Sequence, residues 1–376
     1  VAALETWPRT GVPASPEAWL TTAAKRNLLH AARHTRVIED PAVTTLLELE
    51  ASVEASVVLP DSRLNLMFVC AHPAIDETVR TPLMLQTVLG VDVGRIASAF
   101  LVSPSAMAQR LVRAKQKIRD ARIAFDPPEA RELAGRMDAV LEGIYAAFGA
   151  DWESAGVDAT GSGIASNIAL DGLAQEAIFL ARVVSSLLPD EPEPIGLLAL
   201  LLSSHARRAA RFTDSAAGVA TFVPLTEQDT ARWNRSAIVE ADRLLARAAA
   251  LRRPGPFQLE AAIQSAHCQR LFTGATPWTG IVELYRALNR LAPIRASEIG
   301  LAVALVEIGD LTEARRVLDA LPAASVRAHQ PYWIARWHLA RRCGDATAAR
   351  AALVNGIGLT VDPRVRVYLA SQLQPA

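Results

Sequence analysis

Apolar residues recur along this chain mostly at intervals of three or four positions, the spacing that is typical of amphipathic helices. Ala, Leu and Arg, which are strong helix formers, are frequent throughout. The clearest apolar stripe has heptad spacing and consists of Met107, Leu111, Ala114 and Ile118. The pattern therefore predicts an all-α fold.

Breaks in this pattern divide the chain into helical regions and linkers. Residues 37–60 are acidic and lack a clear period, and residues 126–132 contain two successive prolines that end any helix, so both are interpreted as linkers. The linkers separate two helical pieces in 1–36, a compact helical block in 61–125 and an array of antiparallel helix pairs in 133–376.

A weak repeat appears near the end of the array. Two segments contain Gly, Asp, Ala and Leu at positions that are 35 residues apart. The matching pairs are Gly309/Gly344, Asp310/Asp345, Ala314/Ala349 and Leu318/Leu353. This period is close to the roughly 34 residues of tetratricopeptide repeats, in which a small residue lets two helices approach. We expect a tetratricopeptide-like end to the array, although any helical hairpin can contain a Gly-Asp turn.

Capping side chains mark the helix starts in the compact block. Asp61 and Asp76 begin the first two predicted helices, and Ser103 followed by Pro104 begins the last. A short helix over residues 93–100 precedes this last helix and is joined to it by a tight turn. Such an arrangement is typical of a helix-turn-helix motif, whose second helix enters the DNA major groove with its amino end first.

Positive charge is concentrated on the second helix of this motif. The whole chain carries 39 basic and 39 acidic residues, but residues 110–122 hold six Arg or Lys and one acid, Asp120. Outward Arg and Gln side chains can read base edges, and flanking cations can contact phosphates. The alternative is an ordinary amphipathic helix with a solvated basic face.

The overall charge and the apolar runs restrict the possible partners. A neutral total argues against a protein that is coated in nucleic acid or lies on a membrane surface. The longest apolar run, Ile195 to Leu202, is far shorter than the ~20 residues of a membrane-spanning helix. We therefore expect no membrane association.

Several ordered segments resemble one known family. Residues 61–75 and 83–128 are similar to the promoter −35-reading domain of extracytoplasmic-function sigma factors, in the subgroup with a long helical carboxy-terminal extension. Residues 7–34 resemble the end of the −10 domain of these factors. Segments that resemble hallmarks of the extension are 187–212, 225–238 and 253–267.

This resemblance implies a dissociable sigma subunit that binds the RNA polymerase core and promoter DNA. It implies that 1–36 is the remnant of the −10 domain (sigma region 2) and that 61–125 is the −35 domain (region 4). Val1 lies in the middle of a predicted helix, so we expect the natural chain to begin upstream of it. Because most of the −10 domain is missing, we expect this shorter chain to be unable to start transcription. The DNA contacts that the resemblance implies are Ser105, Gln109, Arg110, Arg113 and Lys117 at the −35 element, and Lys25, Arg26 and Arg33 near the −10 element.

The cysteines form no recognisable metal or disulfide pattern. They are widely spaced, without a Cys-x-x-Cys pair, at Cys70, Cys268 and Cys343. So few thiols favour the cytoplasm. Cys70 and His72 stand where the resembling family usually has two adjacent cysteines before the histidine, and we interpret them as a buried thiol and a cap rather than as metal ligands.

One polar cluster in the extension could bind a small ligand or an acidic peptide. It would combine Arg207, Arg208, Arg211, Glu227, Asp229 and Arg232. The alternative is that Thr226 and Asp229 form a capping arrangement at a helix start. No Ser/His/Asp order, carboxylate pair or metal triad stands out, so we expect no enzymatic activity, cofactor or metal.

Three hypotheses follow from these observations. The first is a cytoplasmic sigma factor that directs RNA polymerase to −35/−10 promoters, with an extension that serves as a built-in interaction module for a regulatory protein or a small ligand. The second is a tetratricopeptide-like adaptor or ligand-sensing regulator that keeps a degenerate helix-turn-helix and is inactive as a sigma factor. The third is that acids of the extension mask the basic helix in the free protein.

Overall fold

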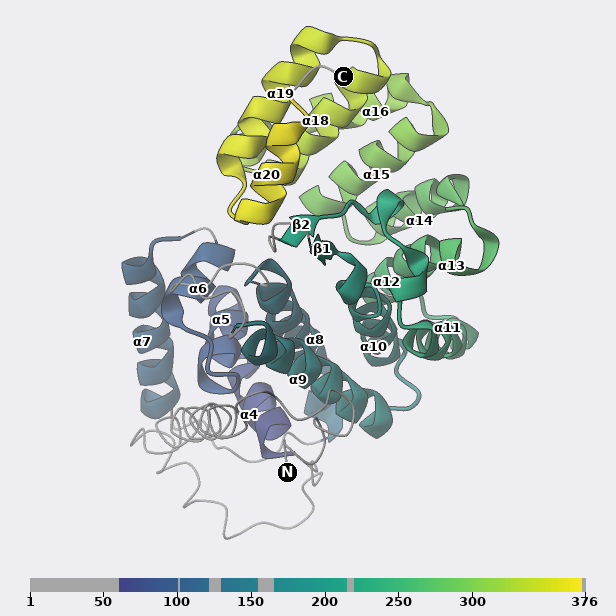
Figure 1. Ribbon diagram of the computed structural model, residues 1–376. Helices are drawn as coiled ribbons and strands as arrows, with labels where there is room; N and C mark the ends of the chain where they lie inside the picture. The colour runs from purple at the N-terminus through teal and green to yellow at the C-terminus, as the bar shows by residue number, and fades with distance from the viewer. Residues whose placement is uncertain (1–60, 101, 122–129, 155–165, 215–219, 374–376) are drawn as a thin grey trace, which may run out of the picture. The chain divides into compact units, whose positions relative to one another are not determined.

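The computed structural model describes most of the chain as two compact units of α-helices (Figure 1). The fold is all-α, as predicted, with one two-stranded sheet in addition. None of the described helices combines the length and the apolar character needed to cross a bilayer. The residues described are 61–100, 102–121, 130–154, 166–214 and 220–373, so the predicted −10 remnant and first linker lie outside them.

The first unit comprises residues 61–150, where described, and residues 168–173. Asp61 Oδ1 accepts a hydrogen bond from the Arg63 N–H at 2.8 Å, and Asp76 Oδ1 accepts one from the Thr78 N–H at 2.9 Å, so both predicted caps are confirmed. The helices of this unit are α4 (Ser62–Cys70), α5 (Glu77–Thr87), α6 (Val93–Ala99), α7 (Pro104–Asp120) and α8 (Ala130–Ser154).

Helix α8 packs on the earlier helices of the first unit. A Cβ at Gly143 would lie 2.6 Å from Met84 Sδ, so the absence of a side chain is what permits this close approach. The buried Arg136 donates from Nη1 to the Phe68 carbonyl at 3.4 Å. The compact units consequently divide later in the chain than the linker predicted at 126–132.

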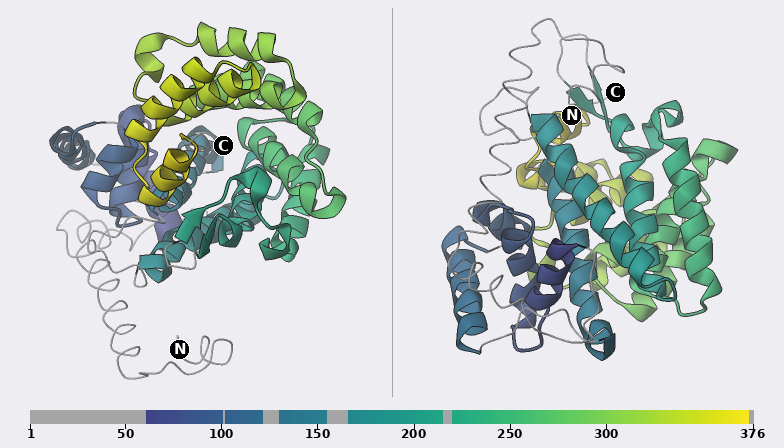
Figure 2. Two further views of the ribbon diagram at one scale, coloured as in Figure 1. Left: turned by 45° about the horizontal axis from the view of Figure 1, so that its top comes forward. Right: turned by 90° about the horizontal axis from the view of Figure 1, so that it is seen from below.

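The second unit is a row of packed helices that curves back on itself (Figure 2). Residues 168–173 of its first helix, α9, group with the first unit. The row begins with α9 (Ser166–Leu187), α10 (Pro192–His205), α11 (Arg235–Ala250), α12 (Pro256–Cys268), α13 (Arg270–Thr273) and α14 (Trp278–Leu291). It continues through α15 (Arg295–Ile308), α16 (Leu311–Ala320), α17 (Ala323–Val326), α18 (Gln330–Arg342), α19 (Ala346–Leu359) and α20 (Pro363–Ser371).

The repeat expected near the end of the array is present as two similar helical hairpins, α15–α16 and α18–α19. Gly309 and Gly344 end the first helix of each pair with φ of +87° and +75°, a conformation that glycine adopts without a steric penalty. Asp310 and Asp345 then cap the second helices. The matched alanines and leucines are all buried: Ala314, Leu318, Ala349 and Leu353.

A small antiparallel sheet meets the last helix of the second unit. Strands β1 (Phe212–Asp214) and β2 (Ala220–Phe222) pair with Phe212 opposite Phe222. The Phe222 ring lies 5.5 Å from the Tyr368 ring of α20, centroid to centroid, and the Arg364 guanidinium lies 3.5 Å from the Phe212 ring centroid. The last helix is therefore held against a hairpin that is about 150 residues earlier in the chain, within the ordinary range of aromatic and cation–π contacts.

Candidate nucleic-acid interface

The basic helix α7 begins where the sequence predicts. Ser103 is its cap, and its Oγ accepts a hydrogen bond from the Ala106 N–H at 3.2 Å. Pro104 occupies the first helical position, where its missing N–H costs nothing. The predicted apolar stripe of Met107, Leu111, Ala114 and Ile118 is buried.

Helix α6 packs against α7 and precedes it by a short turn. Asp92 caps α6 by accepting from the Gly94 N–H at 2.7 Å. The Val102 N–H donates to the Ala97 carbonyl at 3.0 Å, which ties the turn to the end of α6. A short helix, a tight turn and a longer basic helix are thus all present in the predicted order.

The side chains predicted to contact the −35 element share the solvent side of α7. All are exposed: Ser105, Gln109, Arg110, Arg113 and Lys117. Arg113 Nε donates to the Gln109 carbonyl at 3.4 Å, within its own helix. Among the described residues, no carboxylate forms an ion pair with Arg110, Arg113 or Lys117. Lys25, Arg26 and Arg33 lie outside the residues that the structure describes.

The Cys70 and His72 pair has the structural role that the sequence indicates. Burial raises the pKa of the Cys70 thiol to about 11, and Cys70 Sγ lies 3.5 Å from Thr87 Oγ1. His72 Nδ1 accepts a hydrogen bond from the Ala74 N–H at 3.1 Å, which is a local cap. The interpretation as a buried thiol and a cap is confirmed.

The six residues of the proposed ligand cluster differ widely in exposure. Arg207 is 6% exposed, whereas Glu227, Asp229 and Arg232 are open to solvent. Asp229 caps a short 3-10 helix, η3 (Thr230–Arg232), by accepting from the Ala231 N–H at 2.9 Å. Arg232 Nη1 donates to the Phe212 carbonyl at 3.0 Å. The capping alternative for Asp229 is therefore present, without Thr226 as the capping residue.

The two remaining basic members lie beside Arg207 in the chain and are half-buried. Arg208 begins the short 3-10 helix η1 (Arg208–Ala210), and Arg211 follows it. The Arg211 guanidinium carbon lies 5.2 Å from the centroid of the Phe212 ring. Ligand binding at this cluster stays a prediction.

The buried Arg207 shares one aromatic ring with Arg270, which the sequence analysis did not identify. Their guanidinium carbons lie 6.0 Å and 5.1 Å from the centroid of the Trp233 ring. Arg207 donates to the Ser203 carbonyl and to Gln264, and Arg270 donates to the carbonyls of Thr226 and Gln228. Arg270 stands outside the three hallmark segments, so no motif marked it.

Burial governs the protonation of groups around this ring. It lowers the pKa of the Arg207 guanidinium from its ordinary value. Burial and the nearby Arg207 charge also lower the pKa of His267 to about 3, so His267 is neutral in the folded protein. The His267 ring lies 5.3 Å from the Trp278 ring, edge to face. Arg207 is buried and His267 is partly buried, so both groups take part in the helix packing.

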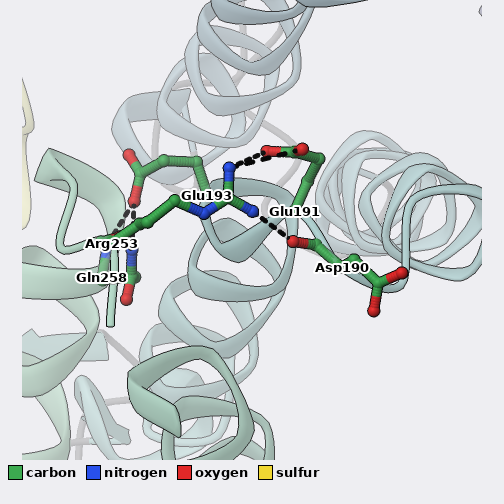
Figure 3. Close-up of polar contacts among 5 residues, drawn as sticks. All are labelled: Asp190, Glu191, Glu193, Arg253 and Gln258. Carbon is green, nitrogen blue, oxygen red and sulfur yellow. Dashed lines mark hydrogen bonds and ion pairs between the residues drawn. The ribbon is translucent and has the colours of Figure 1, made fainter. Parts of the chain in front are cut away.

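Two hallmark segments, 187–212 and 253–267, are joined by a second set of polar contacts (Figure 3). The Glu193 carboxylate accepts hydrogen bonds from the Phe257 and Gln258 N–H groups at 2.9 and 3.2 Å, which caps the start of α12 from the neighbouring helix α10. Arg253 donates to the Asp190 carbonyl and forms an ion pair with Glu191 at 3.2 Å. A carboxylate suits a helix amino end because the N–H groups there lack partners within the helix.

The chain has a relative that matches nearly its whole length. An uncharacterized protein of Rhizobium meliloti (strain 1021) is 34% identical over 380 aligned residues, which cover 99% of this chain and 87% of that protein. The chain belongs to the same family as this Rhizobium protein. Residues 136–249 also match a family of unknown function (DUF6596). No solved structure matches the chain significantly.

The segment that matches DUF6596 begins within α8 and ends at the end of α11. It includes Glu193, Arg207 and Trp233, but neither α7 nor the two helical hairpins at the end of the array. The matched segment therefore includes Glu193 but not its partner Gln258. It likewise includes Trp233 but not Arg270, because Gln258 and Arg270 follow it in the chain.

Proposed function

We propose that the chain is a sigma-type transcription initiation factor that brings the RNA polymerase core to promoter DNA. The observation that carries this proposal is α7, a basic helix in a helix-turn-helix arrangement whose exposed Arg110, Arg113 and Lys117 form no ion pair with a carboxylate among the described residues. Such cations attract backbone phosphates, and the amino end of such a helix fits the major groove. A protein with this role acts in the cytoplasm.

The decisive experiment is a titration of the bacterial RNA polymerase core with this chain and with its longer natural form, if one exists. Binding of the core, together with transcription from a −35/−10 promoter by the natural form, is the expected result. If neither form binds the core, the proposal is contradicted. Binding to duplex DNA is measured in the same series with a matched and a scrambled −35 sequence.

A second candidate function is favoured by the paired hairpins α15–α16 and α18–α19. Their matching turns and buried alanines are the features that tetratricopeptide repeats use to build peptide-binding arrays. In this alternative the chain is an adaptor or a ligand-sensing regulator whose helix-turn-helix is degenerate. Stable binding of a protein partner by a chain that neither binds the core nor prefers any DNA sequence would support it.

The proposal that the extension masks α7 requires a truncation that respects the compact units. Cutting after Pro128 would remove α8 and uncover the Met67 and Met84 side chains that pack against Gly143. A chain that ends at Leu173 keeps every described residue of the first unit. Masking predicts that this truncated chain binds DNA more tightly than the full chain, and equal affinities would contradict it.

A further inference from the structure

Two stripes with the same spacing run along α7. The buried stripe is Met107, Leu111, Ala114 and Ile118, and a second, exposed stripe is Ser105, Gln109, Val112 and Gln116. The second stripe begins two residues earlier, and two residues correspond to about half a turn of an α-helix. The exposed stripe therefore faces directly away from the core of the first unit.

The exposed stripe is uncharged and is bordered by cations on both sides. Helical geometry places Arg110 and Lys117 along one border and Lys115 and Arg119 along the other, with Arg113 between the first border and the stripe. A helix in the major groove has phosphates on its two flanks and base edges in front of it. The arrangement of charge on α7 matches that environment, because its cations are lateral and its neutral side chains are central.

Val112 is the unusual member of this stripe. Its side chain is 64% exposed, although it is fully apolar. Gln116 is already bonded, since its Nε2 donates to Asp120 at 2.8 Å and its Oε1 accepts from Arg119 at 2.6 Å. The stripe toward the amino end thus offers the polar groups of Ser105 and Gln109 and the two methyl groups of Val112.

We propose that Val112 contacts the C5-methyl group of a thymine and thereby selects thymine at one position of the DNA site. The thymine methyl is the apolar group that base edges present in the major groove, and an apolar side chain is the matching contact. This inference rests on the proposed function, because it requires α7 to lie in the major groove of promoter DNA. It adds a specificity-determining residue that carries no charge and forms no hydrogen bond through its side chain.

The test uses the full chain and a duplex selected by that chain from randomised DNA. Each thymine of the selected duplex is replaced singly by deoxyuridine, which pairs identically but lacks the methyl group. Burying one methyl is worth about 0.8 kcal/mol, so one replacement should weaken binding by the unsubstituted chain about fourfold. Val112→Ala should bind the thymine duplex about as weakly as the unsubstituted chain binds the deoxyuridine duplex. Its affinity should not change when deoxyuridine replaces thymine at that position.

Two variants provide the controls. Val112→Thr keeps one methyl group and should retain part of the sensitivity to deoxyuridine. Val367→Ala changes a valine of α20 that is 63% exposed and lies outside the basic helix, so it should leave the whole deoxyuridine profile unchanged. Val112→Ala removes only exposed methyl groups, so its fold should be intact, which circular dichroism checks.

The possible failures are distinguishable. A deoxyuridine profile that is the same for the unsubstituted chain and for Val112→Ala would overturn the role of Val112 while leaving the sigma-type function standing. Selection that recovers no preferred sequence, with equal binding to scrambled duplex, would overturn the proposed function and the Val112 contact with it.

Discussion

Arginine side chains are used differently in the two units of this protein. On α7 of the first unit, Arg110 and Arg113 extend into solvent, and the ion pairs of the described residues include neither of them. In the second unit, Arg207 and Arg270 lie over the Trp233 ring and donate to carbonyl and amide oxygens of neighbouring segments. Whether a cation can bind an external anion therefore depends on its partners: Arg110 and Arg113 face solvent, whereas Arg207 and Arg270 already bond to groups within the protein.

The energetic consequences of the two arrangements also differ. A buried guanidinium that loses its partners leaves unsatisfied polar groups, which costs stability. An exposed guanidinium without partners contributes little to stability and remains available for binding. Substitutions at the contacts of Arg207 and Arg270 with Trp233 should therefore change folding, and substitutions of Arg110 or Arg113 should change binding while leaving folding intact.

The largest expected effect concerns Trp233, which is 5% exposed. Trp233→Ala removes the ring under both guanidinium groups and the Nε1 donor to Gln228, so it should lower the free energy of unfolding by about 3–5 kcal/mol. Urea denaturation followed by circular dichroism measures this change. Trp233→Phe keeps an aromatic face and should cost less, and equal losses for the two variants would mean that the ring does not support the arginines.

The next effect is an acid-induced loss of stability at His267. Its folded-state pKa of about 3 is below the ordinary value of 6.5, so protons bind the unfolded chain first. The stabilisation from neutral His267 is complete above about pH 6.5 and is lost as the pH falls toward 3. By linkage it should amount to roughly 2–3 kcal/mol between pH 7 and pH 4.5. Urea denaturation at the two pH values measures the difference in the free energy of unfolding, which should be smaller for His267→Gln. Identical pH dependence of the two chains would contradict the role of His267.

A smaller but more specific effect is expected at Arg113. Arg113→Ala should weaken binding to the selected duplex by ~1–3 kcal/mol and relax its sequence preference, because a guanidinium can bond two acceptors on a base edge. Its effect on the free energy of unfolding should stay within about 0.5 kcal/mol, since the side chain is exposed. Equal losses for selected and scrambled duplex would identify Arg113 as a phosphate contact.

The smallest effect should come from the lateral cations. Arg110→Ala and Lys117→Ala should each weaken binding to all duplexes to a similar degree and reduce the slope of log affinity against log salt by about 1. Fluorescence anisotropy at several salt concentrations measures this slope. Arg253→Ala, which changes an arginine held by Glu191 and Asp190 in the second unit, is the matched control and should leave the slope unchanged.

Local rules made most of α7 predictable from the sequence. Ser103 and Pro104 fix its start, and the spacing of Met107, Leu111 and Ala114 fixes its buried side. The same rules found Gly309 and Gly344 at the turns of the paired hairpins, because their positive φ angles are encoded by a residue type at a fixed position. Each of these features depends on neighbours that are close in the sequence.

Contacts between distant segments were not predictable in the same way. Nothing local to Arg270 indicates that its guanidinium will lie on Trp233, and the side chain of Glu193 caps a helix that begins more than 60 residues later. Strands β1 and β2 were missed because each is a three-residue segment, which is too short for a periodic pattern. The placement of α8 in the first unit likewise depends on the fit of Gly143 against Met84.

The sequence by itself determined the all-α class, the starts and faces of the helices, the concentration of cations on α7 and the repeated Gly-Asp turns. The tertiary structure alone decided which arginines bond to groups within the protein and which face solvent. It also decided with which helices α8 packs. The physical reason is range: caps, turns and amphipathic faces arise from interactions within a few residues, whereas burial and the pairing of charges depend on which distant segments share a core.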